Sequence, residues 1–531
     1  MLQRALPGLL LLAAATAAGP LFAHDDDGKG VLGKVTFANS CSKAVQADLQ
    51  RGVAMLHSFW YSEGMQTFRS IQQRDPQCVP AAWGIASLQM DNPLAGVGAS
   101  PKGAEEAQAA IAQGRLATRT TQRELDYLEA VAAYYQDFGE RSEAARQRSR
   151  SDAYAALAQR YPRDDEAQIF SALYLAGTQS QGDQSYAAYL KAAAMLETQF
   201  KRHPEHPGVA HYLIHSYDAP PIAAQGLDAA KRYAGIAPAA PHALHMPSHI
   251  FTRVGLWSDS VATNQRSFNA AVADKDGDSA FHAADYMVYA YLQEGRDAQA
   301  QAAIDAAMQV RSTATAARQT AFYAAAAMPA RMSLERGDWK SAAALKPEKT
   351  RFPYVDAMTH FSRALGAARS GEPALAEQEA EQLGALHKAL LDAKNAYWAR
   401  EVEVQRLAAS AWIAHARGNG DEALKLMRAA ADLEDGNEKH IVTPGRVLPA
   451  RELLGDMLME MKMPAEALQA YEASQQREPN RFRGYSGAAR AAAAAGDRQK
   501  AAGYYAKLVA LAGAATNRPE LAEARQFTAL K

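Results

Sequence analysis

The amino-acid sequence predicts an all-α protein assembled from repeated helical units, and three observations support this fold class. Alanine is abundant while aromatic residues make up only 8% of the chain, a balance that favours closely packed helices over sheets. The pattern M-P-x7-G-x-W occurs twice, at 246–257 and 328–339. Near the C-terminus two similar units begin 34 residues apart, at Leu448 and Phe482, which indicates an internal repeat.

The beginning of the chain reads as an export signal. Residues 1–23 combine a positive start at Arg4, a short and mostly apolar run, and a helix-breaking exit, so we expect a signal peptide there and a leader over 24–44. An uncleaved membrane anchor is the alternative, although the apolar run is short for a span. No later segment is apolar enough to cross a bilayer. The expected location is therefore periplasmic or secreted.

Length and charge limit the partners. A chain of 531 residues can bury several cores or one long repetitive core. The formal net charge of −1 includes no basic surplus, so we expect no nucleic-acid partner. After signal cleavage we expect no membrane span, and we expect a small molecule or a peptide as the partner.

The repeating units resemble the tetratricopeptide repeat (TPR), a helix–turn–helix of 34 residues that stacks into a right-handed superhelix. The match is specific at 448–515 and good at 207–310. The phrases HYLIHSYD (211–218) and HALHMPSHIF (242–251) also resemble a group of secreted bacterial TPR proteins. The resemblance implies an α-solenoid, in which each unit buries its apolar face against its neighbours. It implies no particular activity.

On this basis we divide the mature chain into three parts. We expect N-terminal TPR-like repeats at 45–206, histidine-lined repeats that carry a site at 207–312, and C-terminal TPR repeats at 313–531. Polar interruptions in the repeats are expected to be loops, and loops on solenoids often carry function. They lie at 91–103, 176–185, 274–280 and 436–447.

The chain contains two cysteines, Cys41 and Cys78. An exported protein meets conditions in which disulfides persist. In the TPR register the unit 45–78 would start and end at the same edge of its hairpin, which implies that the two cysteines lie close together. We expect a disulfide worth roughly 3–4 kcal/mol in the chain-entropy model.

The histidines fall into the repeat register. With units starting at Pro207, Pro241 and near Phe281, several histidines and aspartates occupy the second, fifth, ninth and twelfth places. In the TPR family these places face the concave groove. The resemblance therefore implies that eight residues converge there: His211, His215, Asp218, His242, His245, His249, His282 and Asp285.

Helical geometry supports this convergence independently. Residues four apart share one helix face, so His211/His215 and His245/His249 are natural two-point chelates. Imidazole and carboxylate without thiolate suit zinc, copper, nickel, manganese or iron. The eight candidates exceed the needs of one four-coordinate ion, so some support the ligands from behind or two ions bind. Asp218 and Asp285 are the candidate catalytic bases or supporting carboxylates.

Three stretches leave alternatives open. Proline is accepted in the first turn of a helix, so Pro247 suggests a helix that begins near His245 and leaves His242 in the loop before it. The aromatic stretch 56–61 is repeat core or lines a ligand site. The stretch 438–446 is a structural Pro-Gly turn or contacts a ligand in the groove.

The sequence supports three functions. The first is an exported solenoid whose groove binds a divalent transition metal for hydrolysis or ligand binding. The second is a non-catalytic TPR scaffold for a protein or peptide, and the third is metal storage or delivery. No nucleophile elbow, phosphate-binding loop, dinucleotide fingerprint or H-E-x-x-H motif is present. An open coordination position in a bounded pocket would favour the enzyme, and a long continuous groove would favour the scaffold.

Overall fold

The computed structural model describes residues 30–311, 318–513 and 518–529. The predicted signal peptide and the first part of the leader lie outside the described residues. Throughout the described part of the chain the structure consists of helices joined by turns and loops, with no strand. The predicted all-α fold class is therefore confirmed.

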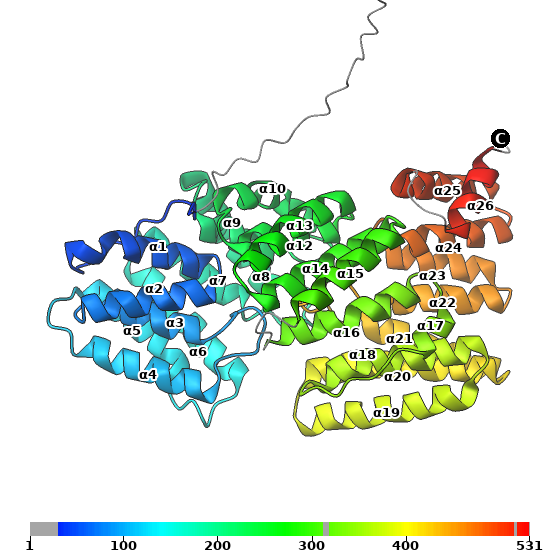
Figure 1. Cartoon of the computed structure of the whole chain (residues 1–531), viewed down its shortest axis with the longest axis horizontal. Coiled ribbons are helices and arrows are strands. Elements are labelled where there is room, and N and C mark those ends of the chain that lie inside the picture. The colour runs from blue at the N-terminus through cyan, green and yellow to red at the C-terminus, as the bar shows by residue number, and fades with distance from the viewer. Residues whose placement is uncertain (1–29, 312–317, 514–517, 530–531) are drawn as a thin grey trace, which may run out of the picture.

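Successive helices pack as antiparallel pairs along the whole chain (Figure 1). The N-terminal helices are η2 (Lys43–Val45), α1 (Gln46–His57), α2 (Tyr61–Arg74), α3 (Val79–Gln89), α4 (Pro101–Arg115), α5 (Gln122–Tyr135), α6 (Glu143–Arg160), α7 (Asp165–Ala176) and α8 (Ala187–Arg202).

The central helices are α9 (Pro207–Ser216), η3 (Ala223–Gly226), α10 (Leu227–Ile236), α11 (Pro241–His245), α12 (Pro247–Arg253), α13 (Trp257–Ala273), α14 (Gly277–Gln293), α15 (Asp297–Val310) and α16 (Gln319–Leu334).

The C-terminal helices are α17 (Trp339–Ala343), α18 (Pro353–Ser370), α19 (Pro373–Asp392), α20 (Ala396–Ala416), α21 (Gly420–Asp435), α22 (Ala450–Glu460), α23 (Pro464–Arg477), α24 (Phe482–Ala494), α25 (Arg498–Ala512) and α26 (Pro519–Ala529).

The repeated M-P-x7-G-x-W pattern has a structural explanation. Gly255 and Gly337 adopt φ of 71° and 65° between two helices, a left-handed conformation that glycine adopts without a steric penalty. The tryptophans that follow, Trp257 and Trp339, begin the second helix of each pair. The pattern therefore marks the turn inside a helical hairpin. Two of the expected units start where predicted, at Pro207 and Pro241.

Two helix starts differ from the predictions. α11 begins at Pro241, so His242 lies in its first turn and not in a preceding loop. Pro247, which has no N–H to donate, instead separates α11 from α12. The repeat register of the third unit still starts near Phe281, but its helix α14 begins one turn earlier, at Gly277, because the Asp276 side chain accepts a hydrogen bond from Ser279 N and caps the helix there.

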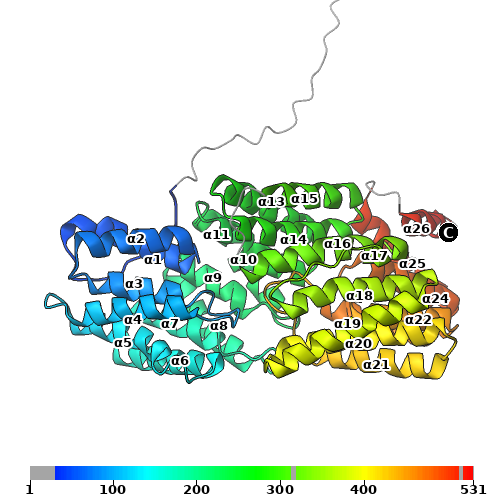
Figure 2. The same cartoon turned by 60° about the horizontal axis from the view of Figure 1, so that its bottom comes forward.

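The solenoid curls back on itself, so that the histidine-bearing central helices lie between the N-terminal and C-terminal blocks in both views (Figure 2). α24 contacts α14 directly. At this junction the buried Arg481 donates to Tyr289 Oη at 2.6 Å, and Trp257 Nε1 donates to the Asn480 carbonyl at 2.7 Å. These contacts hold the C-terminal repeats against the helices that carry the histidines.

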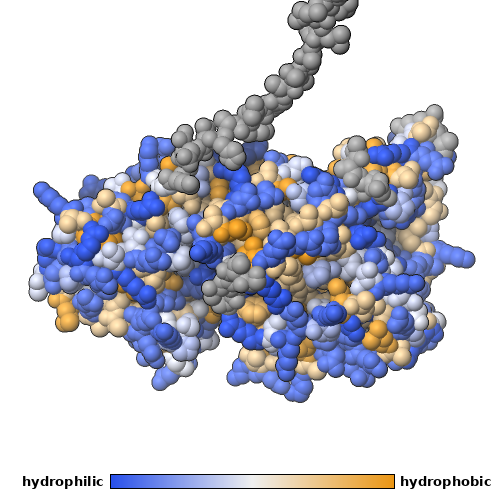
Figure 3. Space-filling view, in the orientation of Figure 1, coloured by the Kyte–Doolittle hydropathy of each residue, from blue (hydrophilic) through white to orange (hydrophobic). Residues whose placement is uncertain are grey.

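The disulfide and the surface complete the description. Cys41 and Cys78 are joined, with their Cα atoms 4.7 Å apart. The face seen in Figure 3 is mostly hydrophilic, with small hydrophobic patches between polar residues. Among the described residues, no helix is both long and apolar enough to cross a bilayer.

Candidate metal centre

Six histidines from three successive units meet in the interior. Their ligand atoms form two groups, within each of which the atoms lie no more than 4.8 Å apart. The first triad is His211, His215 and His242, and the second triad is His245, His249 and His282. Each triad combines a pair four residues apart from one unit with a histidine near the start of the next unit. The repeat register thus explains why the same arrangement occurs twice.

Hydrogen bonds behind the rings determine which ring nitrogen carries the proton. His211 Nδ1 lies 2.6 Å from the carbonyl of His57, and His249 Nδ1 lies 2.8 Å from Asp218 Oδ2. His245 Nδ1 lies 2.6 Å from Asn264 Oδ1, and Asn264 Nδ2 donates to the Ser260 carbonyl, which fixes the orientation of the amide. Each partner oxygen is an acceptor, so each Nδ1 donates and each Nε2 keeps its lone pair.

These lone pairs are directed at other imidazoles. In the second triad His245 Nε2 and His249 Nε2 are 3.0 Å apart. Because both rings already donate through Nδ1, neither neutral ring has a proton to place between these two nitrogens. In the first triad His211 Nε2 lies 3.1 Å from His215 Nε2. Neutral His215 can donate a proton to His211 only in the tautomer that carries the proton on Nε2 and leaves Nδ1 unprotonated. Among the described residues His215 Nδ1 has no hydrogen-bond partner.

Burial makes a protonated imidazole costly at this place. His211, His215, His245 and His249 are almost wholly buried. Loss of hydration lowers the pKa of each of these rings below the ordinary value. Neighbouring imidazoles lower the pKa of His211, His215 and His245 further, whereas Asp218 partly opposes the shift at His249. A bound cation is the alternative to a proton, because it can accept the lone pairs of the facing nitrogens. In metal sites, a ligand histidine typically donates its other ring N–H to a carboxylate or carbonyl, as the Nδ1 atoms of His211, His245 and His249 do.

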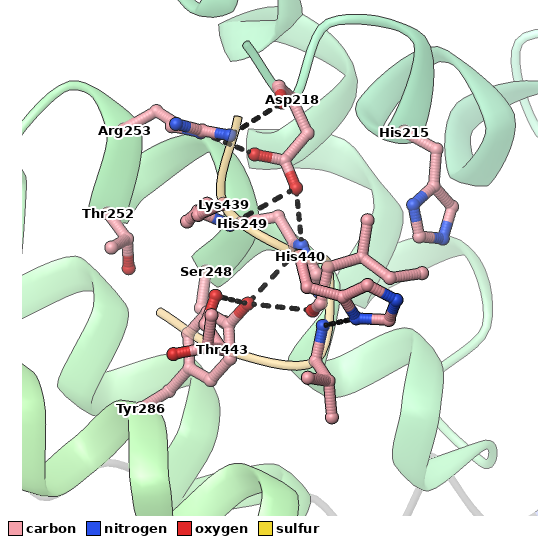
Figure 4. Close-up of polar contacts among 12 residues, drawn as sticks. His215, Asp218, Ser248, His249, Thr252, Arg253, Tyr286, Lys439, His440 and Thr443 are labelled. Atoms are coloured by element: carbon pink, nitrogen blue, oxygen red, sulfur yellow. Dashed lines mark hydrogen bonds and ion pairs between the residues drawn. The ribbon is translucent and has the colours of Figure 1, made fainter. Parts of the chain in front are cut away.

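Asp218 supports the second triad from behind. Its Oδ2 accepts the His249 hydrogen bond, its Oδ1 accepts one from Arg253 Nε at 2.7 Å, and Lys439 Nζ lies 3.5 Å from Oδ2. Burial acts to raise the pKa of Asp218, but Lys439 and Arg253 hold it well below its usual range. The carboxylate is therefore charged and fully engaged (Figure 4).

Asp285 is placed differently from the expectation. It pairs with Arg331 of α16, which also donates to Thr443 Oγ1 at 2.7 Å and to the Gly445 carbonyl at 3.0 Å. Burial raises the pKa of Asp285 to about 6, with Arg331 opposing the shift. Within the described part of the chain, its recorded side-chain partner is Arg331 and not a histidine. Asp285 thus anchors a neighbouring segment.

That segment, residues 437–449, is here called the inner segment. It is non-helical and almost completely buried. Tyr286 Oη of α14 lies within hydrogen-bond distance of the Ile441 and Thr443 carbonyls, and Tyr397 of α20 donates to the Glu438 carbonyl. The inner segment therefore runs through the interior between units that are far apart in sequence (Figure 4).

A cleft of about 550 Å³ opens onto the two triads. Its walls include four of the six histidines together with residues of the polar loops 91–103 and 274–280 and of the inner segment. These are His215, His242, His249 and His282 with Phe59, Tyr61, Asp91, Asn92, Asp274, Asp276, Asp278, Arg318, Arg351, Phe352, Ile441 and Val442. Of the stretches left open above, 56–61 and 438–446 both contribute to this wall.

Sequence reasoning missed the residues that support the site. His57, which is not among the predicted site residues, belongs to a buried group in which its Nε2 and His206 Nε2 lie 2.9 and 3.1 Å from the two oxygens of Glu166. Tyr212 Oη lies 2.9 Å from His57 Nδ1, so the hydrogen-bonding atoms of this ring are occupied. Its carbonyl orients His211. No spacing in the sequence points to this group.

Comparisons with known proteins add little to this picture. No family model and no curated protein matches the chain. Among solved structures, the Cut9–Hcn1 hetero-tetramer of the APC/C is similar at 12% identity and a TM-score of 0.30, over 91% of this chain and 95% of that one. Yeast Tom70 is similar at 12% identity and a TM-score of 0.31, over 91% and 88%. Superpositions this weak carry no argument about function.

The class of protein follows from the helices themselves. Helical hairpins recur at a spacing of 34 residues between Pro207 and Pro241, and neighbouring hairpins pack in sequence order along the chain. The protein is an α-solenoid of TPR-like helix–turn–helix repeats. It differs from a simple solenoid in one respect, because the inner segment occupies its interior.

Proposed function

We propose that this protein is an exported metalloprotein, in which the two histidine triads bind a transition metal that acts on a small molecule in the cleft. The observation that carries the proposal is the contact between His245 and His249. Two neutral imidazoles that both donate through Nδ1 present facing lone pairs at 3.0 Å. Two nitrogens at this separation are within reach of one ion with metal–nitrogen bonds of about 2.0–2.1 Å.

The cleft favours a small molecule over a peptide. A TPR scaffold would offer an open concave groove, but the inner segment lies there with its own backbone carbonyls paired to Tyr286 and Arg331. The remaining space of about 550 Å³ falls within the usual range for small-molecule sites. Storage or delivery, the third alternative, would be served better by an exposed site than by buried ligands.

Export is supported by two features of the chain. The N-terminal 23 residues have the composition of a signal peptide, and the Cys41–Cys78 disulfide is of the kind that persists outside the cytoplasm. Secretion into the periplasm or the medium is tested by fractionating cells that produce the full-length chain and sequencing the N-terminus of the exported product.

The central experiment measures metal in the purified, exported protein. We expect stoichiometric transition metal in the wild type and its loss in the double variant His215→Ala/His249→Ala, with helical content by circular dichroism nearly unchanged. His415→Ala is the matched control, because His415 contacts Glu460 and lies outside both triads. The proposal fails if the wild type neither carries nor takes up metal, or if the double variant retains it.

A further inference from the structure

The two triads share one arrangement of rings, although a carboxylate, Asp218, supports the second triad alone among the described residues. Each has one pair of facing Nε2 atoms, at 3.1 Å in the first and 3.0 Å in the second, and a third ring from the following unit. Between the triads the rings remain close, with centroids 5.5 Å apart for His215 and His249 and 5.9 Å apart for His242 and His245. An ion with about four ligands can take three from the protein and one from solvent or a bound molecule. Six histidines in two groups of three therefore suit two neighbouring ions.

We propose that each triad binds one copper ion and that the copper pair oxidises a small aromatic diphenol with dioxygen. This inference rests on the proposed function. Three observations carry the choice of metal and of reaction: the fixed charge around the triads, the engagement of the nearby carboxylates, and the aromatic wall of the cleft.

The fixed charge favours a metal with a monovalent state. Among the described residues, Asp218 is the carboxylate that forms a hydrogen bond with one of the six histidines, His249, and Arg253 and Lys439 already balance its charge. Two divalent ions would add four positive charges to buried, neutral ligands, whereas two copper(I) ions would add two. Uncompensated buried charge is costly, and imidazole is a good ligand for copper. An oxygen anion from the cleft can compensate the additional charge when the pair is oxidised.

The carboxylates disfavour hydrolysis. Metal-assisted hydrolysis needs a group that accepts a proton from water. Asp218 is bound to His249, Arg253 and Lys439. Asp285 is paired with Arg331 through Oδ1, and its Oδ2 has no hydrogen-bond partner among the described residues. Neither carboxylate is among the residues that line the cleft, so neither is placed to take a proton from water there. Electron transfer to dioxygen makes no such demand on the protein, because the reduced oxygen itself takes up the protons released by the substrate.

The cleft presents an aromatic wall next to the first triad. The Phe59 ring lies nearly parallel to His242 and His215, with centroids at 5.6 and 6.2 Å and interplanar angles of 25° and 29°. Its backbone has φ of 50°, a left-handed conformation that a bulky side chain adopts rarely and that tends to mark functional positions. A flat aromatic ring that enters the cleft can stack against Phe59 and reach the histidine ligands with its oxygen substituents.

The reaction balances without a further reagent. A diphenol with adjacent hydroxyls loses two electrons and two protons to become the quinone, and the pair passes from copper(II) to copper(I). Dioxygen takes four electrons and four protons from two such oxidations and leaves as two water molecules. The expected stoichiometry is one dioxygen consumed for every two quinones formed.

The experiment uses the full-length exported protein, freed of metal and reloaded with copper(I) without oxygen. We expect two copper ions per chain, loss of the copper(II) electron paramagnetic resonance signal through coupling after oxygenation, and quinone formation from catechol with the stated oxygen ratio. His282→Ala and His242→Ala each remove one ligand from a different triad, so each should leave one copper ion with a visible signal. His415→Ala should keep two coupled ions.

The outcomes separate this inference from the proposed function. Binding of no metal overturns both. One ion per chain, or two uncoupled copper(II) signals, overturns the paired centre and leaves metal binding intact. A coupled pair that produces no quinone from catechol overturns the assignment of substrate and reaction. Phe59→Ala adds a separate check, since we expect it to raise KM for catechol several-fold without changing copper content, and an unchanged KM contradicts the stacking role.

Discussion

Asp218 gives the sharpest test of how the second triad is supported. Asp218→Asn keeps the shape of the side chain and removes its charge, so His249 retains a weaker acceptor while Arg253 and Lys439 lose their shared carboxylate. Breaking a buried ion pair from one side costs about 3–5 kcal/mol of unfolding free energy. Loss of a carboxylate behind a ligand histidine lowers metal affinity by about 10–100-fold.

Asp285→Asn is the matched control. It also breaks a buried aspartate–arginine pair, with Arg331. Among the described residues, however, Asp285 forms no hydrogen bond or ion pair with a histidine. We expect a comparable loss of stability and an unchanged metal affinity. Denaturant titration of the chelator-treated proteins measures the first quantity, and competition with a chelator of known affinity measures the second. If Asp285→Asn weakens metal binding as much as Asp218→Asn, the supporting role of Asp218 is refuted.

Three further predictions concern the scaffold. Free-thiol titration of the unfolded, unreduced protein should find no thiol, and Cys41→Ser/Cys78→Ser should lower the unfolding free energy by about 3–4 kcal/mol; two reactive thiols would contradict this. Because burial lowers the pKa of Lys439 from 10.5 to about 8, the unfolded chain holds that proton more tightly. The unfolding free energy of the wild type relative to Lys439→Met should therefore rise by about 3 kcal/mol as pH increases through this interval. Urea titrations at a series of pH values measure this difference. A difference that does not change with pH would contradict the burial of the charge. Gly255 and Gly418 both have positive φ, so alanine at either position should destabilise by roughly 1–2 kcal/mol through backbone strain. Gly255→Ala should destabilise by more than Gly418→Ala, because an added Cβ at Gly255 would lie 2.7 Å from Asn480 in the turn between α23 and α24, while Gly418 has open space. Equal effects in thermal unfolding would contradict that close contact.

The repeat register predicted the convergence of the histidines. His211 and His245 occupy the same place in units that begin at Pro207 and Pro241, and both units start where expected. Equivalent positions in stacked repeats lie next to one another, and the resemblance to the TPR family indicated which of these places face inward. The division into two triads did not follow, because it depends on the position of His242 in the first turn of α11. A helix that began near His245 would have placed this ring elsewhere.

The inner segment could not be predicted from the sequence. A polar stretch such as 438–446 is normally solvated, and its burial here depends on partners supplied by other units. Lys439 lies against Asp218, Thr443 against Arg331, and His440 Nε2 lies 3.1 Å from the Ala95 carbonyl. None of these pairings has a characteristic spacing, since the partners are separated by a hundred residues or more.

The change from histidine to aspartate at the fifth place of the third unit explains where the histidine cluster ends. His211 and His245 direct Nε2 into the two triads, whereas Asp285 at the equivalent place pairs with Arg331. Arg331 in turn donates to Thr443 Oγ1 and the Gly445 carbonyl. At the repeat place where two units carry a histidine, the third unit thus carries an aspartate that, through Arg331, holds the inner segment. The segment then passes beside Asp218 and contributes Ile441 and Val442 to the wall of the cleft. The same repeat position thus contributes a histidine to the cluster in two units and holds the inner segment in the third, which is why a bounded cleft forms inside a fold that would otherwise present an open groove.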